Sequence, residues 1–169
     1  NLPGRLADRT VVLQAPSKTY NLAGLGYSFA VIPNGPLRRK FTQAKGHILP
    51  EINCLSYYAA EAAYRHGEPW RQDLLAYLRG NRDLITTFVR DEIPGVVVPW
   101  IEATYLAWLD FRPLRIENPA KLLEEKAGLF LSDGAFFDGP GHARLNFGCP
   151  RASLQNALER IRDAVASRA

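Results

Sequence analysis

The feature that most constrains the fold is a pair of short apolar, β-branched runs that enclose a turn-rich segment. The runs are Thr10–Gln14 (TVVLQ) and Ser28–Ile32 (SFAVI), and proline-containing turn residues follow each of them. Runs of this length and composition, bounded by such residues, are typical of buried strands. We therefore expect two adjacent strands of one sheet, the first a buried parallel strand, with Lys18 in the loop just beyond its end.

Helical periodicity replaces the strand pattern after these runs. Between residues 37 and 66 the apolar positions indicate helix, and Gly67 is a plausible stop. From Pro69 to the break at residues 94–95, apolar residues recur at the spacing of one long amphipathic helix, which often bridges two domains. The face expected to be buried in the first region consists of Ile52, Leu55, Ala59, Ala62 and Ala63.

The remainder of the chain interleaves short strands with helices. Asn118-Pro119 is typical of a helix start and Gly128 of its end, and a closing helix is expected from about Pro150. The expected strands are Val96–Val98, Tyr105–Phe111, Leu129–Leu131 and Ala143–Gly148. The fold class is therefore α/β, with residues 1–70 as the C-terminal remnant of a large domain and residues 71–169 as a small α+β domain.

Composition excludes several classes of partner. The 21 Lys+Arg residues exceed the 17 Asp+Glu, but they are scattered and form one tight cluster, Arg38-Arg39-Lys40, so no nucleic-acid partner is expected. No apolar run approaches the roughly 18 to 20 residues of a membrane span. We expect a cytoplasmic protein with no membrane partner. Because the chain begins at Asn1 and contains no methionine, we interpret it as a fragment of a longer polypeptide.

The same composition argues against a metal centre. Cys54 and Cys149 are far apart in the sequence, and His47, His66 and His142 lack the spacing of metal ligands. No metal site is therefore expected.

Lys18 is the residue with the clearest chemical potential. A lysine directly after a buried strand can have its amine partly desolvated at a cleft, and desolvation favours the neutral amine that condenses with an aldehyde. For an arbitrary lysine a solvated surface position is the better interpretation. The local sequence around Lys18 favours the chemical one.

The stretch Ala15–Leu25 (APSKTYNLAGL) closely resembles the Schiff-base lysine segment of fold-type I pyridoxal-phosphate enzymes of the aminotransferase superfamily (class I/II). The resemblance is to the branch of cystathionine beta-lyases called the MalY/PatB family. It continues in order along essentially the whole chain, through residues 32–34 (IPN), 59–67 (AAEAAYRHG), 103–110 (ATYLAWLD) and 144–154 (RLNFGCPRASL).

The resemblance implies a cofactor and three site residues. Lys18 would hold pyridoxal 5'-phosphate and act as general base at the substrate Cα, Ser17 would donate to the cofactor phosphate, and Arg144 would bind the α-carboxylate of an amino-acid substrate. A serine before a turn can equally be a local backbone cap. Many relatives carry a basic residue eight positions after this lysine, where this chain has Gly26.

Three functions remain open at this point. The first, implied by the resemblance, is the C-terminal part of a carbon-sulfur β-lyase that eliminates a thiol from cystathionine or a cysteine S-conjugate and leaves pyruvate and ammonia. The second is an aminotransferase that uses the same lysine and arginine, and the third is a non-catalytic interaction fragment. The resemblance further implies a homodimer in the full-length protein. The upstream cofactor contacts are missing, so the fragment alone is expected to be inactive.

Overall fold

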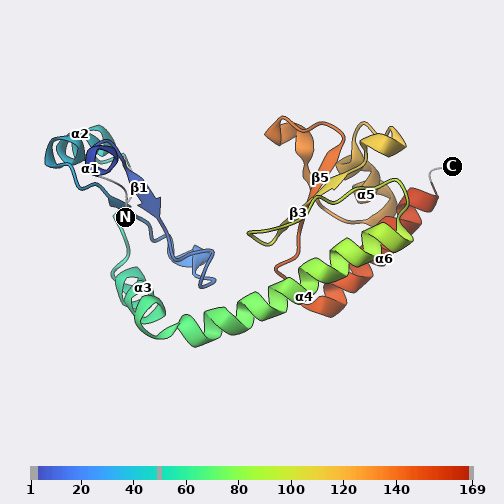
Figure 1. Cartoon of the computed structure of the whole chain (residues 1–169), viewed down its shortest axis with the longest axis horizontal. Coiled ribbons are helices and arrows are strands. Elements are labelled where there is room, and N and C mark those ends of the chain that lie inside the picture. The colour runs from blue at the N-terminus through green and yellow to red at the C-terminus, as the bar shows by residue number, and fades with distance from the viewer. Residues whose placement is uncertain (1–3, 49–50, 168–169) are drawn as a thin grey trace. The chain divides into compact units, whose positions relative to one another are not determined.

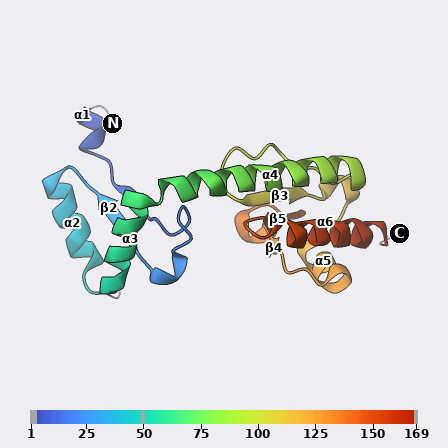
Figure 2. The same cartoon turned by 90° about the horizontal axis from the view of Figure 1, so that it is seen from below.

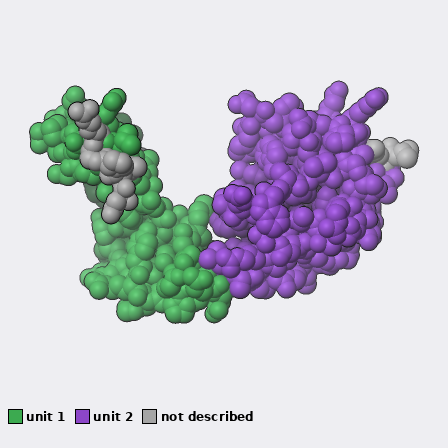
Figure 3. All heavy atoms as spheres, viewed as in Figure 1, with its two compact units in different colours: residues 1–73 green, residues 74–169 purple. Residues whose placement is uncertain are grey.

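The computed structural model describes residues 4–48 and 51–167 and divides the chain into two compact units, residues 1–73 and 74–169. Figure 1 shows the order of the elements along the chain, and Figure 3 colours the two units. Among the described residues, no helix is both long and apolar enough to cross a membrane.

Unit 1 contains a two-stranded ribbon. Strand β1 (Val12–Gln14) pairs with β2 (Phe29–Val31) in antiparallel register, with Leu13 opposite Ala30. The expectation of two adjacent strands is confirmed, but the expected parallel direction is wrong. The connection between them holds only turns and the short 3-10 helix η1 (Ala23–Leu25), whereas parallel strands need a longer crossover, usually a helix.

The expected burial of the first strand is also wrong within this unit. The Leu13 side chain is 69% exposed, and those of Phe29 and Val31 in β2 are exposed as well. The ribbon therefore presents apolar side chains on its surface.

The helical region expected between residues 37 and 66 is divided between two helices in the part of the chain that the structure describes. Helix α1 (Gly4–Ala7) precedes the ribbon, and α2 (Gly35–Lys45) and α3 (Cys54–His66) follow it. The expectation of helix between residues 37 and 66 is thus only partly right, because the chain leaves the helical conformation at Gly46, which has a φ of 51°.

Helix α3 ends at Gly67 as expected, but a different face is buried. Its buried residues are Ser56 and Ala60, whereas Leu55 and Ala62 are exposed. The buried face of α3 is thus made of small side chains, which let a neighbouring segment approach closely.

Unit 2 is an antiparallel sheet packed against helices. Helix α4 (Glu68–Glu92) spans the boundary between the units, and its bounds confirm the long helix expected from the sequence. Strands β3 (Leu106–Asp110), β5 (His142–Asn146) and β4 (Ser132–Asp133) form a sheet in that order. The remaining elements are the 3-10 helices η2 (Arg112–Leu114) and η3 (Gly134–Phe137) and the helices α5 (Pro119–Ala127) and α6 (Arg151–Ala166).

The core of unit 2 lies between this sheet and its helices. Figures 1 and 2 show α4 and α6 side by side. Asn81 of α4, fully buried, donates to the carbonyl oxygens of Phe147 and Cys149 at 3.0 Å each and accepts from Arg151 Nε at 3.1 Å. Arg151 therefore ties α6 to α4. The largest buried apolar residues are Phe111, Phe147, Ile85, Ile93, Leu109, Leu123, Leu154, Leu158 and Ile161.

Two expected strands of unit 2 are corrected. Val96–Val98 forms only a single bridge, between Val97 and Asp110. Leu129–Leu131 is not a strand, because the Leu129 amide donates to Leu123 O and the Gly128 amide to Glu124 O, closing the C-terminus of α5. The ladder therefore begins only at Ser132.

Candidate functional site

Lys18 lies on a tight turn that follows strand β1. Pro16 before it is fully buried, the Pro16 carbonyl accepts from the Tyr20 amide at 2.9 Å, and the Ser17 carbonyl accepts from the Leu22 amide at 2.9 Å. Asn21 has a φ of 55°, a left-handed conformation that asparagine tolerates better than most residues. The turn is thus anchored by its backbone, while Lys18 is exposed and Ser17 half-buried.

Helix α3 supports the loop that carries Lys18. The Ser56 hydroxyl donates to Leu25 O at 2.7 Å, and the Tyr20 ring meets the Tyr64 ring edge-on with centroids 5.7 Å apart. A Cβ at Gly67 would lie 2.8 Å from Tyr20 Cε1, so this helix end has room only for glycine. Gly67 therefore ends the helix, as expected from the sequence, and also allows the Tyr20 ring to pack closely against the helix end.

The position eight residues after Lys18 is a left-handed glycine. Gly26 has a φ of 61°, closes η1 as its C-cap, and has no atom within 4 Å of a Cβ built there. The loop therefore has open space at the position where many relatives carry a basic side chain. The partial desolvation expected for the Lys18 amine is not provided by unit 1, where the side chain is exposed.

Arg144 occupies the central strand of unit 2, on the face of the sheet opposite the core. It lies across from Trp108 in β3 and from Ser132 in β4. Its Nη2 donates to Ser132 Oγ at 3.1 Å, and its guanidinium carbon lies 4.4 Å from the centroid of the Phe137 ring. None of the ion pairs found among residues 4–48 and 51–167 includes Arg144.

The same face carries a second polar group at the end of β3 and β5. His142 is buried and its ring stacks on Trp108 with centroids 5.1 Å apart. Its Nε2 lies 3.7 Å from Asp110 Oδ1, and Arg112 Nη2 donates to Asp110 Oδ2 at 2.7 Å. Trp108 therefore lies on the face of Arg144 and not in the core, as strand alternation requires.

Hydrogen bonding holds Asp110 in its ionised form. The side chain of Arg112 is the main cause, its backbone amide adds a further hydrogen bond, and His142 contributes electrostatically; together they lower the pKa of Asp110 to about 2. The Asp110 side chain is only 16% exposed, whereas that of Arg112 is 65% exposed. The ion pair at the end of the sheet thus joins a mostly buried carboxylate to a largely solvated guanidinium.

This pKa predicts a pH-dependent stability. A carboxyl whose pKa is lower in the folded than in the unfolded state stabilises the fold above the unfolded pKa, and this contribution is lost as the pH falls through the folded pKa. Because Arg112 is largely solvated, we expect the contribution to be about 1 kcal/mol. In urea unfolding of the full-length protein, Asp110→Asn should cost this amount at pH 6 and clearly less at pH 2, where the folded-state carboxyl is about half protonated. Asp83→Asn, which removes an exposed carboxylate paired with the half-buried Arg82, is the control, and an equal cost of Asp110→Asn at both pH values contradicts the assignment.

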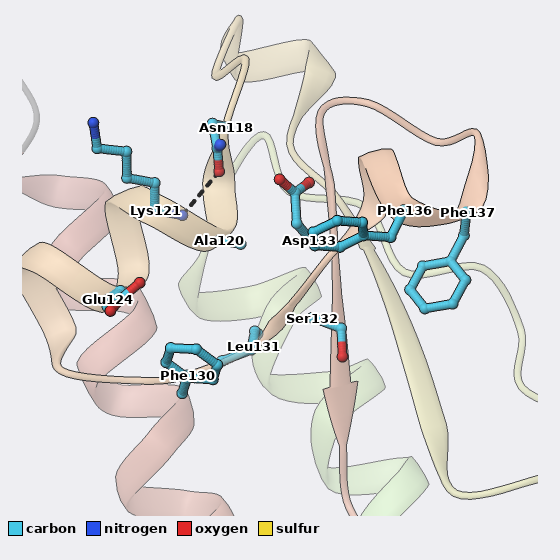
Figure 4. Close-up of a pocket in the computed structure, with 10 residues that line it drawn as sticks. All are labelled: Asn118, Ala120, Lys121, Glu124, Phe130, Leu131, Ser132, Asp133, Phe136 and Phe137. Carbon is cyan, nitrogen blue, oxygen red and sulfur yellow. Dashed lines mark hydrogen bonds between the residues drawn. The ribbon is translucent and has the colours of Figure 1, made fainter.

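A pocket of about 550 Å³ is lined in part by residues that contact Arg144 (Figure 4). Ser132 and Phe137, which contact Arg144, belong to its lining, while the rings of Phe130 and Phe136 are 90% and 84% exposed. A smaller pocket of about 270 Å³ includes Arg144 itself together with Ser132. The guanidinium is therefore accessible from the surface of unit 2.

The site residues expected from the sequence are thus divided between the units. Lys18 and Ser17 belong to unit 1 and Arg144 to unit 2, and each is described within its own unit. Sequence reasoning missed the supporting residues Ser56, Ser132 and Phe137. The only sequence signal for any of them is the proximity of Ser132 and Phe137 to Arg144 along the chain.

Comparison with known proteins gives consistent matches over nearly the whole chain. The aminotransferase class I and II family matches residues 4–161. Cystathionine beta-lyase PatB of Bacillus subtilis (strain 168) is 36% identical over 171 residues, covering 98% of this chain and 44% of PatB. The crystal structure of OvoB is similar with a TM-score of 0.92 and 41% identity, over 98% of this chain and 43% of OvoB.

A third match has a cofactor. Cystalysin from Treponema denticola, whose structure contains pyridoxal 5'-phosphate, gives a TM-score of 0.90 at 32% identity, over 96% of this chain and 43% of cystalysin. The chain spans less than half the length of each of these three proteins.

Proposed function

We propose that this chain, which belongs to the aminotransferase class I and II family, is the C-terminal part of a pyridoxal-phosphate-dependent carbon-sulfur β-lyase. The full-length protein would cleave cystathionine or another cysteine S-conjugate by α,β-elimination to a thiol, pyruvate and ammonia. The observation that carries the proposal is the 36% identity with cystathionine beta-lyase PatB along 98% of the chain. The expected α/β fold of the type I pyridoxal-phosphate enzymes is confirmed by the structural matches.

The residues of unit 1 fit a covalently held aldehyde cofactor with a phosphate group. An exposed primary amine, Lys18, lies on an anchored turn, Ser17 precedes it in the chain, and the space around the Gly26 Cα is open. Pyridoxal 5'-phosphate, when bound, supplies an electron-accepting ring. The lack of a basic side chain at Gly26 leaves most of the phosphate charge to residues outside this chain.

Each proposed site residue has one chemical task. Lys18 would hold the cofactor through its amine and would remove the proton from the substrate Cα. Arg144 binds the α-carboxylate, since its planar fork offers paired donors and no described acidic side chain occupies them. Ser17 donates to the phosphate.

The arrangement of the whole protein is part of the proposal. Residues 1–70 would complete the large cofactor-binding domain and residues 71–169 would form the small domain. The full-length protein would be a cytoplasmic homodimer with an amino-acid substrate, and this chain alone would bind cofactor weakly. The exposed apolar ribbon of unit 1 supports an incomplete large domain.

A product assay on the full-length protein distinguishes lyase from aminotransferase. An aminotransferase is the second candidate, because the family that matches the chain is described as aminotransferase class I and II. Both activities would use the same lysine and arginine. With cystathionine as the only substrate we expect pyruvate and ammonia in equal amounts, and no effect of added keto acid. Turnover that depends strictly on a keto-acid acceptor would replace the lyase by an aminotransferase.

A further inference from the structure

The Arg144 guanidinium is held from two directions by uncharged groups. The face of the group lies 4.4 Å from the Phe137 ring centroid, and one edge donates from Nη2 to Ser132 Oγ at 3.1 Å. An aromatic ring attracts a cation over its face and leaves the in-plane N–H groups of a guanidinium free. The remaining N–H groups of Arg144 can therefore still donate to a carboxylate in the plane.

The backbone turn that carries Phe137 is anchored by hydrogen bonds. Phe137 lies in η3, whose N-cap residue Asp133 accepts from the Ala135 amide through its side chain at 2.9 Å, and the Gly139 amide donates to Gly134 O at 3.0 Å. A Cβ at Gly134 would come within 2.7 Å of His142 O and overlap Gly139 O, so the turn packs directly on the chain that leads into β5.

The Phe137 ring also contacts a second aromatic residue, Trp108, which in turn stacks on His142. The Trp108 ring meets Phe137 edge-on with centroids 6.0 Å apart. Trp108 is also the strand partner of Arg144. The Phe137 ring thus contacts both Arg144 and the strand partner of Arg144.

Ser132 is placed by the strand register. It lies directly opposite Arg144 in the pairing of β4 with β5, so the two side chains share one face of the sheet. The strand register therefore places the Ser132 hydroxyl within hydrogen-bonding reach of Arg144.

We infer that Phe137 and Ser132 are positioning residues that hold the Arg144 guanidinium in the orientation that binds the substrate α-carboxylate. The inference rests on the proposed role of Arg144. A long, unpaired arginine side chain samples many rotamers, and fixing it before the substrate arrives lowers the entropic cost of binding. Removing either support should weaken binding of the carboxylate without slowing the steps that follow.

The test uses Phe137→Leu in the full-length protein, with Phe137→Tyr as the conservative variant. Leucine keeps apolar bulk but removes the ring face, whereas tyrosine keeps the ring, and Phe137 is 48% exposed, which leaves space for its hydroxyl. We expect Phe137→Leu to raise KM for cystathionine about three- to tenfold with kcat within about twofold, and Phe137→Tyr to behave as the wild type. Phe136→Leu, on the neighbouring exposed ring of the same turn, is the matched control.

A pair of inhibitors isolates the carboxylate. Phe137→Leu should weaken competitive inhibition by L-alanine about three- to tenfold and leave inhibition by ethylamine, which lacks the carboxylate, unchanged. Ser132→Ala should do the same and Ser132→Thr should not, which gives an independent test if Phe137→Leu fails to fold. Equal weakening of both inhibitors, or no difference from Phe136→Leu, would overturn the inference.

Arg144→Gln separates this inference from the proposed function. If Arg144→Gln removes the preference for L-alanine over ethylamine and the Phe137→Leu and Ser132→Ala variants leave that preference unchanged, the positioning role is wrong and the carboxylate role of Arg144 stands. If Arg144→Gln keeps the preference, the proposed role of Arg144 fails, and the inference fails with it.

Discussion

Replacing Lys18 with alanine in the full-length protein is expected to lower kcat for cystathionine cleavage by about 10²- to 10⁴-fold, the usual range for loss of a positioned general base. Lys18→Arg should be nearly as inactive, because arginine keeps the charge but cannot act as a neutral amine at ordinary pH. Lys40→Ala, at an exposed lysine of helix α2 in the same unit, should keep wild-type activity.

A chemical readout accompanies the rate. Borohydride reduction of the wild-type protein, followed by peptide mass spectrometry, should find the cofactor attached to Lys18 and to no other lysine. Lys18→Ala that retains both cofactor and full activity would remove Lys18 from the mechanism. A wild-type protein that neither binds cofactor nor turns over cystathionine would instead favour the non-catalytic interaction fragment.

Local signals were sufficient for the loop of Lys18 and for several helix ends. Asn118 caps α5 by accepting from the Lys121 amide, and Gly128 ends it with a φ of 58°. These are interactions between residues a few positions apart, so the residue types alone specify them. The turn residues at 15–16 likewise placed Lys18 beyond a strand.

Properties that depend on distant partners were not predictable in the same way. A short apolar run carries no information on strand direction, so the antiparallel pairing of β1 with β2 could not be predicted from either run. The buried face of α3 depends on the Lys18 loop, where Ser56 donates to Leu25 O across 31 positions of the chain. For the same reason the contacts of Ser132 and Phe137 with Arg144 required the register of β4 with β5.

Replacement of Arg144 is the second change with a large expected effect. Truncating one partner of a buried, hydrogen-bonded charge pair costs about 2 to 5 kcal/mol, which is about 30- to several thousand-fold in affinity. Arg144→Gln should therefore lower kcat/KM for cystathionine by about 10²- to 10³-fold. Arg144→Lys should recover only part of this loss, because an ammonium keeps the charge but not the bidentate geometry.

The loss should appear mainly in KM, since the contact proposed for Arg144 is with the carboxylate and not with the atoms whose bonds change. Arg79→Gln, at an exposed position of α4 in the same unit, removes an equal charge and should leave kcat/KM unchanged. Steady-state kinetics of the three variants on full-length protein make the measurement. If Arg144→Lys matched the wild type, charge alone would suffice, and a paired contact between the planar guanidinium and the carboxylate would be ruled out.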